Sequence, residues 1–160
     1  PEVQAAMDAG LGVKGKNRLL INKEYGSWFF ISEIVTTMRL PAAEIKETAC
    51  LNCGKCIAAC PTHALTENGF DKNLCLSDIT QRKGELTPEQ EELIKKTGCA
   101  WGCDICQTVC PMNKKVKINP AKVFLDGIET TARTDNISDR AYAWRGEKVI
   151  KRNLDIITGQ

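Results

Sequence analysis

Twelve residues in the first half of this chain decide its fold: residues 50–61 read CLNCGKCIAACP. The spacing is CxxCxxCxxxCP, which is typical of bacterial proteins that carry iron–sulfur clusters. Three cysteines at i, i+3 and i+6 on a tight loop can point at three irons of one [4Fe–4S] cube. The fourth cysteine, Cys60, lies beyond the turn, so we expect it to reach a second cube.

A second cysteine run partly repeats the first and ends in the same Cys-Pro pair, Cys110-Pro111. A full copy would need a cysteine at position 100, where Ala100 stands. Crossed ligation assigns to the first cube Cys50, Cys53, Cys56 and Cys110. It assigns to the second cube Cys60, Cys103 and Cys106. The second cube needs a fourth ligand, for which Cys75 and Cys99 compete on spacing alone.

Two other uses of cysteine compete with iron–sulfur ligation. A secreted disulfide scaffold usually has an even number of scattered cysteines, whereas the nine here are bunched. Two CxxC pairs could bind zinc, but zinc explains neither the continuous run nor its partial repetition. Bunched thiols also suit a reducing compartment, which favours a cytoplasmic protein.

Composition and charge are those of a folded, water-exposed chain. The sequence is 42% hydrophobic and 26% charged, with a net charge of +2. Residues 111–160 hold 10 Lys and Arg against 6 Asp and Glu, whereas residues 1–110 hold 12 against 14. The basic excess of the last third indicates either a solvated helix surface or a face for an anionic partner. No apolar run approaches the roughly 20 residues of a membrane span, so no membrane association is expected.

A glycine-rich stretch near the start resembles two nucleotide motifs by letter. Gly10, Gly12 and Gly15 spell GxGxxG, but a helical pattern and not a strand precedes them. With Lys16 the stretch nearly spells a P-loop, yet Asn17 stands where Ser or Thr would bind magnesium. The simpler interpretation is a turn that brings backbone close to a ligand or to another backbone.

Local patterns predict short elements around the cysteine runs. A helix is expected over residues 3–9 with Gly10 as its stop, and a short extended segment over residues 18–21. Aromatic and β-branched residues predict a strand over residues 28–37. A capping pattern that begins at Thr87 predicts a helix that runs to about Lys96. One or two amphipathic helices are expected within residues 138–157, and turns at residues 24–27 and at Asn68-Gly69.

Beyond the cysteine spacing, four collinear stretches resemble one enzyme family, epoxyqueuosine reductase. They are the string from Ala9 to Ile21, then Gly26 to Phe30, then Gly102 to Asn113, and the tail from Arg140 to Asn153. That family is a cobalamin-dependent enzyme with two [4Fe–4S] clusters. It reduces epoxyqueuosine at the wobble position of certain tRNAs to queuosine.

The resemblance implies roles for individual residues. Family members carry a lone cysteine placed as Cys75 is, which ligates the second cluster, so Cys99 becomes the spare thiol. The glycine-rich stretch borders cobalamin in the family. The implied cobalamin contacts are Gly10, Gly12, Gly15, Lys16, Asn17, Ser27 and Trp28.

The resemblance also implies an α+β fold in three parts. Residues 1–45 would be the end of an α/β cobalamin-binding domain, and residues 46–118 a ferredoxin-like domain for two [4Fe–4S] clusters. Residues 119–160 would be a helical segment that begins a HEAT-like region. No catalytic residue is expected within this chain, because the family's general-acid aspartate would lie upstream of Pro1. The chain alone is therefore expected to be inactive.

The implied function is electron relay within a tRNA-modifying oxidoreductase. Its expected partners are the anticodon region of tRNA and an external electron donor, and a monomer is expected. Two alternatives from other classes remain open on the sequence. One is a two-cluster ferredoxin-type carrier without catalysis. The roughly 45 residues before Cys50 argue against a minimal ferredoxin. The other is a related cobalamin enzyme, such as a reductive dehalogenase.

Overall fold

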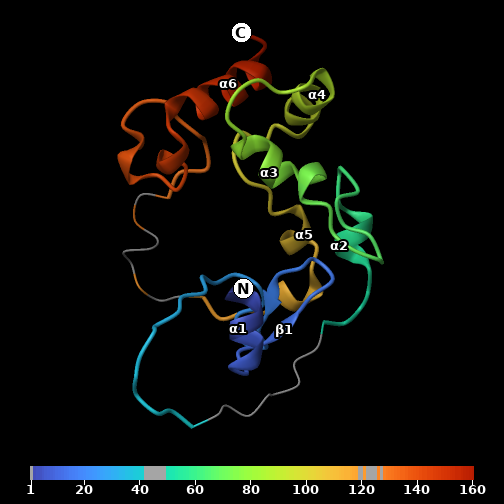
Figure 1. Cartoon of the computed structure of the whole chain (residues 1–160). Coiled ribbons are helices and arrows are strands. Elements are labelled where there is room, and N and C mark those ends of the chain that lie inside the picture. Colours follow the sequence, from blue (N-terminus) through green and yellow to red (C-terminus); the bar gives the residue numbers. More distant parts are fainter. Residues whose placement is uncertain (1, 42–49, 119–120, 122–125, 127) are drawn as a thin grey trace. The chain divides into compact units, whose positions relative to one another are not determined.

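A computed structural model describes the chain except for residues 1, 42–49, 119–120, 122–125 and 127 (Figure 1). The chain divides into two compact units. The first unit comprises Pro1–Cys60, Leu65–Phe70 and Ile105–Pro120. The second unit comprises Pro61–Ala64, Asp71–Asp104 and Ala121–Gln160. No helix in the described part of the chain is both long and apolar enough to cross a membrane.

The first unit combines short helices with a small antiparallel sheet, in which Val13 pairs with Ile21 and Lys14 with Leu20. Its core is small and is centred on the buried residues Ala6, Leu20 and Ile21. The elements are α1 (Glu2–Asp8), β1 (Val13–Lys14), β2 (Leu20–Ile21), α2 (Lys55–Ala58), α5 (Ile105–Thr108) and the 3₁₀ turn η2 (Pro111–Asn113).

The expected early helix is therefore confirmed as α1. The extended segment expected at residues 18–21 is confirmed only over Leu20–Ile21, as β2, because Arg18 has a left-handed φ of +67°. The hairpin is tight because Gly12 has no side chain. A Cβ atom on Gly12 would lie 2.4 Å from the carbonyl oxygen of Ile21. The glycine pattern in this stretch thus has a packing cause within the hairpin itself.

The strand expected over residues 28–37 is wrong. This stretch is described and has no regular secondary structure, and the side chains of Phe30, Ile34 and Val35 are more than 90% exposed. Aromatic and β-branched residues favour a strand only where a neighbouring strand pairs with it and covers its side chains. The sheet in the described residues contains β1 and β2 alone, so this stretch has no strand beside it.

The second unit is helical. Its elements are η1 (Lys72–Leu74), α3 (Leu76–Gln81), α4 (Pro88–Thr97), η4 (Ile137–Asp139), η5 (Ala143–Arg145) and α6 (Glu147–Thr158). Helix α4 begins with the predicted capping box between Thr87 and Gln90, and ends at Gly98 in a left-handed conformation. The expected C-terminal helical region is present as α6, preceded by two 3₁₀ turns.

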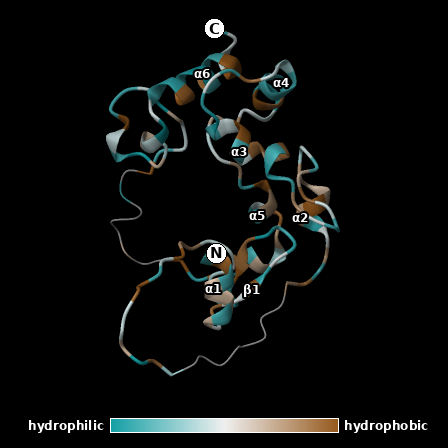
Figure 2. Cartoon of the chain, viewed as in Figure 1, coloured by the Kyte–Doolittle hydropathy of each residue, from teal (hydrophilic) through white to brown (hydrophobic). Residues whose placement is uncertain are grey.

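Helices α3, α4 and α6 share one core, built on Leu76, Ile79 and Ile94. Ile156 and Ile157 of α6 pack against it, and both α4 and α6 carry hydrophobic and hydrophilic residues (Figure 2). This division of each helix into an apolar and a polar side explains why short helices are stable here, since packing and not propensity holds them.

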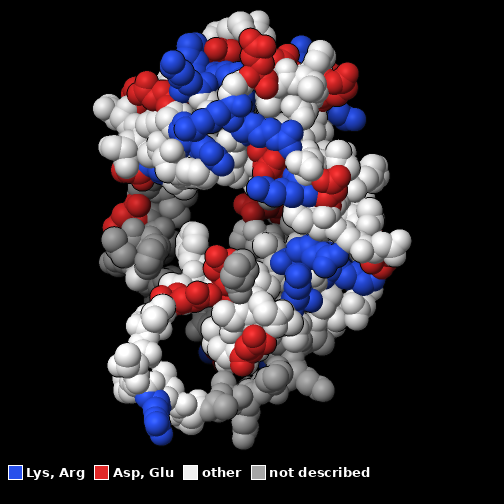
Figure 3. All heavy atoms as spheres, viewed as in Figure 1, with Lys and Arg blue, Asp and Glu red and all other residues white. Residues whose placement is uncertain are grey.

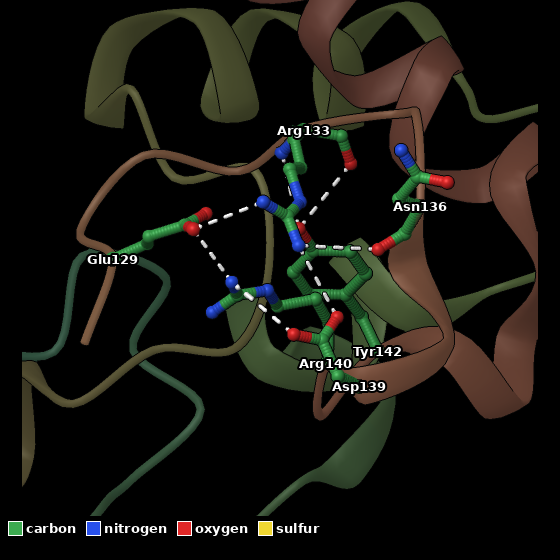
Figure 4. Close-up of polar contacts among 6 residues, drawn as sticks. All are labelled: Glu129, Arg133, Asn136, Asp139, Arg140 and Tyr142. Atoms are coloured by element: carbon green, nitrogen blue, oxygen red, sulfur yellow. Dashed lines mark hydrogen bonds and ion pairs between the residues drawn. The ribbon is translucent and has the colours of Figure 1, made fainter. Parts of the chain in front are cut away.

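A polar network organises the loop that precedes α6 (Figure 4). The Arg133 guanidinium donates to Glu129 at 2.9 Å and to Asp139 at 3.2 Å, and Arg140 also donates to Glu129. The Tyr142 hydroxyl accepts from the Arg133 backbone N–H at 3.0 Å and donates to its carbonyl at 3.2 Å. Tyr142 packs with Ile137 and Ile150, so the network is joined to a second small core.

Asn153 connects α6 to two separate segments of the second unit. Its side chain is fully buried, and its amide nitrogen donates to the carbonyl of Thr80 at 2.7 Å and of Ala100 at 2.8 Å. The neighbouring Arg152 donates to the backbone carbonyl of Arg82 at 2.9 Å. Burial lowers the pKa of the Arg152 guanidinium. These bonds satisfy carbonyl groups that secondary structure leaves without partners.

We predict that Asn153→Ala lowers the free energy of unfolding by about 2–3 kcal/mol, because it leaves two carbonyls without their donor and opens a small cavity. Lys151→Ala on the same helix is the matched control. It removes only an exposed ion pair with Asp155 and should cost less than about 0.5 kcal/mol. Urea unfolding followed by circular dichroism measures both, and equal stability of the two variants would contradict this role for Asn153.

Candidate metal centre

Four cysteines from two distant runs line one pocket in the first unit. They are Cys50, Cys53, Cys56 and Cys110. The side chains of Lys16, Asn17 and Ile21, from the turn and second strand of the hairpin, line the same pocket. The structure therefore brings together the four thiols that the spacing assigns to the first cube, and adds polar residues from the glycine-rich stretch.

The backbone around these cysteines turns sharply before each short helix. In the first run, Asn52 and Gly54 have φ values of +50° and +70°, and α2 begins directly after Gly54. The second run enters α5 after Gly102, whose φ is +70°. Each run then leaves its helix at a Cys-Pro pair. The repeated cysteine spacing is thus accompanied by a repeated local structure.

A cluster of hydrogen bonds holds the segment that carries Cys110. The Asn113 side-chain oxygen accepts from the Ser27 backbone N–H at 2.7 Å, and its amide nitrogen donates to the Ser27 hydroxyl at 2.9 Å. The same amide nitrogen donates to the Gln107 carbonyl at 2.8 Å, and the Ser27 hydroxyl donates to the Gln107 side chain at 2.8 Å. The three bonds of Ser27 join residues 80 or 86 positions apart in the sequence.

Gly26 is required for this cluster. Its φ is +61°, and a Cβ atom there would lie 1.9 Å from the Asn113 side-chain oxygen. Asn113 can therefore reach the Ser27 backbone only because position 26 has no side chain.

The electrostatics of the pocket reflect thiols that lie close together. Burial raises the pKa of the Cys56 thiol, and the charges of Cys50 and Cys110 raise it further. If Cys56 is an iron ligand, iron must displace its proton, and metal loading is then expected to weaken as the pH falls. A hydrogen bond to Glu67 raises the pKa of Lys16, and the charges of Glu67, Cys50 and Cys56 raise it further. A cation therefore stands beside the thiols.

The donor set fits an iron–sulfur cube. Four thiols match the ligands of [4Fe–4S], whose sulfurs also accept hydrogen bonds from the protein. Asn17 is 6% exposed, and its amide nitrogen is buried without a hydrogen-bond partner. Among the described residues, no three His, Cys, Asp or Glu side chains are close enough to share one metal ion. A cube spaces its thiolates more widely, because each of them binds a different iron.

The cysteines predicted for the second cube are divided between the units. Cys60 and Cys106 belong to the first unit, and Cys75 and Cys103 to the second. Cys75 lies between η1 and α3, where it is half-buried. The assignment of these four residues to one cube stays a prediction.

Cys99, the spare thiol, lies in a different setting. It packs against the core of Leu76, Ile79 and Ile94. Its thiol donates to the Gly102 carbonyl at 2.8 Å, and burial raises its pKa. A thiol that donates to a backbone carbonyl in this way has the character of a structural cysteine.

Several of the residues implied as cobalamin contacts make contacts within the first unit. A Cβ atom on Gly15 would lie 2.6 Å from the Asn17 side-chain oxygen, so this glycine makes room for Asn17. Lys16 and Asn17 line the cysteine pocket, and Ser27 bonds to Asn113. Trp28 is 44% exposed. Their contact with cobalamin stays a prediction.

Glu67, Gln107 and Asn113 were not predicted as site residues. Each acts through a contact with a residue far away in the sequence, Lys16 for Glu67 and Ser27 for the other two. The only sequence signal was indirect, because Gln107 and Asn113 lie in the stretch that carries the family resemblance.

Comparison with known proteins places this pocket in a known kind of domain. Residues 49–113 match the family described as "4Fe-4S double cluster binding domain". Over 167 aligned residues the chain is 36% identical to the epoxyqueuosine reductase of Lactococcus garvieae, with 96% of this chain and 47% of the relative covered. The chain belongs to the epoxyqueuosine reductase family. Its cofactors accordingly include two [4Fe–4S] clusters.

Solved structures of epoxyqueuosine reductases agree with this membership. The Streptococcus thermophilus enzyme matches with a TM-score of 0.78 at 31% identity, over 98% of this chain and 44% of its own. A crystal structure of epoxyqueuosine reductase with an epoxyqueuosine-modified tRNA-Tyr stem loop matches with a TM-score of 0.81 at 30% identity, over 98% and 45%. The chain thus spans less than half the length of the epoxyqueuosine reductases it matches.

We predict that Gly26→Ala destabilises this family member more than Gly84→Ala does. Both glycines have positive φ values, +61° and +83°, so both substitutions cost about 1–2 kcal/mol of backbone strain. A Cβ atom on Gly84 meets nothing within 4 Å, whereas one on Gly26 displaces Asn113.

The measurement is iron retained per chain after anaerobic purification, together with the thermal midpoint. Gly84→Ala should keep its iron, and Gly26→Ala should lose iron from the pocket that contains Cys110. Equal iron content and equal midpoints would contradict the role assigned to the Ser27–Asn113 bonds.

Proposed function

We propose that this chain is the iron–sulfur electron-relay portion of an enzyme that reduces epoxyqueuosine to queuosine in tRNA. The observation that carries the proposal is the pocket of four thiols within a chain of the epoxyqueuosine reductase family. When bound, cobalamin would supply the reduced metal that removes the epoxide oxygen, and the cubes would supply its electrons. This chain's residues hold the cubes and set their potentials.

We assign the ligands of the first cube to Cys50, Cys53, Cys56 and Cys110. The ligands of the second cube are Cys60, Cys75, Cys103 and Cys106. Among the described residues, the shared pocket of the first set supports its assignment. For the second set, the choice of Cys75 over Cys99 is supported by the hydrogen bond from Cys99 to the Gly102 carbonyl.

Binding of the tRNA anticodon region is the second element of the proposal. A groove in the second unit is lined by four basic residues and one acidic residue: Lys83, Arg145, Lys148, Arg152 and Glu147. Lys and Arg side chains gather on the face of this unit shown in Figure 3. Such a surface suits the phosphate backbone of a nucleic acid, since it replaces counterions without reading bases.

The three-part division of the chain also belongs to the proposal. Residues 1–45 would complete a cobalamin-binding domain, with Gly10, Gly12, Gly15, Lys16, Asn17, Ser27 and Trp28 near the cofactor. Residues 46–118 would hold the cubes, and residues 119–160 would begin a HEAT-like helical region. An external electron donor would reduce the cubes of a cytoplasmic, monomeric enzyme.

We predict that Cys75→Ala and Cys99→Ala have opposite effects on the second cube. Cys75→Ala should lose roughly half of the bound iron, because one cube loses a ligand. Cys99→Ala should keep all of it, since it removes only a thiol packed in the core. Iron and sulfide assays with electron paramagnetic resonance of the reduced protein measure both. Full iron in Cys75→Ala, with loss in Cys99→Ala, would reverse the assignment.

The full-length protein that contains this chain should convert epoxyqueuosine in a tRNA stem loop to queuosine when cobalamin and a strong reductant are present. Cys50→Ala should bind the stem loop as tightly as the unmodified protein yet lose conversion, because the relay is broken. Mass spectrometry of the nucleosides follows the reaction. Redox activity without any dependence on cobalamin would instead favour a simple electron carrier, and turnover of a halogenated substrate would favour a dehalogenase.

A further inference from the structure

Asn17 presents a hydrogen-bond donor that the protein does not use. The residue is 6% exposed, and its amide nitrogen is buried with no partner. A buried donor left without an acceptor costs about 1–3 kcal/mol, so such groups usually serve a ligand or another partner. Asn17 lines the pocket that also contains Cys50, Cys53, Cys56 and Cys110.

The surrounding structure fixes the side chain of Asn17 in this position. Its oxygen accepts from the Leu19 backbone N–H at 3.3 Å, which leaves the amide nitrogen as the free end. Gly15 provides the space, because a Cβ atom there would lie 2.6 Å from the Asn17 oxygen and 2.5 Å from Ile21 Cδ1. The glycine pattern thus makes room for an amide group beside the thiols.

We propose that the Asn17 side-chain amide donates a hydrogen bond to a sulfur of the first cube and raises that cube's reduction potential. The proposal rests on the proposed ligand set of the first cube. An N–H group directed at a sulfur stabilises the reduced, more negative cube more than the oxidised one. Asn17 is a positioning and tuning residue, and it takes no part as an iron ligand.

Lys16 beside Asn17 supports this assignment. Its ammonium bonds to Glu67, and Lys16 lines the same pocket as Cys50 and Cys56. Positive charge and an N–H donor both favour the reduced cube. Lys16 and Asn17 of the hairpin turn are therefore both expected to raise the cube's reduction potential. Glu67 offsets part of the charge of Lys16, so a substitution of Lys16 would also change the charge balance with Glu67. A substitution of the neutral Asn17 can test the hydrogen bond without changing that balance.

The test compares two variants with the unmodified, cluster-loaded chain by protein-film voltammetry. Asn17→Leu removes the donor without adding charge, and Asn17→Asp keeps the acceptor for Leu19 but adds a negative charge. In each variant one of the two reduction waves should move to lower potential. A tenfold weaker reduction equilibrium corresponds to a shift of about 59 mV for one electron. The other wave should not move.

Asn22→Asp is the matched control for charge. Asn22 belongs to the same unit but does not line the pocket, and its side-chain oxygen accepts from the backbone of Glu24 and Tyr25. This control should shift neither wave by more than a small fraction of the Asn17→Asp shift. Equal shifts in the two variants would mean that general charge, and not a hydrogen bond, sets the potential, and would overturn the proposal.

Iron content separates the possible failures. If the unmodified chain holds no cubes, the proposed ligand set fails. If all variants hold full iron and Asn17→Leu leaves both waves unchanged, the tuning role of Asn17 fails alone, as it would if Asn17 contacted cobalamin instead.

If the Asn17 variants lose iron, a measurement on the unmodified chain still tests whether the Asn17 amide bonds to the cube. Asparagine labelled with ¹⁵N in its side chain should give a hyperfine coupling to the reduced cube in pulsed electron paramagnetic resonance. Absence of that coupling would overturn the proposal.

Discussion

Convergence of Cys110 with the three cysteines of the first run on one pocket is the constraint on which the first unit depends. These residues are more than 50 positions apart, so bringing them together costs loop-closure entropy. The apolar core of the unit is small, centred on Ala6, Leu20 and Ile21. We therefore expect the Ser27–Asn113 bonds, and metal ligation by the proposed ligand set, to carry a share of the stability that a larger domain would draw from its core.

Part of this arrangement was predictable because the cysteine spacing is that of a known ligation pattern, in which the last cysteine of one run reaches the cube of the other run. The cysteine runs predicted which four thiols share a pocket, and the capping pattern at Thr87 predicted where α4 begins. The strand expected at residues 28–37 failed for a physical reason. Strand propensity describes how a side chain fits a paired and covered surface, and in the described structure no strand pairs with these residues.

The features that the sequence did not reveal are contacts across long separations. No local pattern states that Asn113 caps the turn at Gly26, or that Glu67 pairs with Lys16. The glycine-rich stretch shows the same limit, because its letters resemble nucleotide motifs while its geometry serves close backbone packing and a buried amide. Cys99 is similar: its spacing competes with that of Cys75, and its hydrogen bond to Gly102 is what distinguishes the two thiols.

Anomalous diffraction at the iron edge, from crystals of the anaerobically purified protein, tests the central claim most directly. The account predicts two groups of four irons. One group should be bound by Cys50, Cys53, Cys56 and Cys110, with the Asn17 amide facing one of its sulfurs. The other should be bound by Cys60, Cys75, Cys103 and Cys106. Iron bound to Cys99, or a single metal ion in place of a cube, would contradict the account.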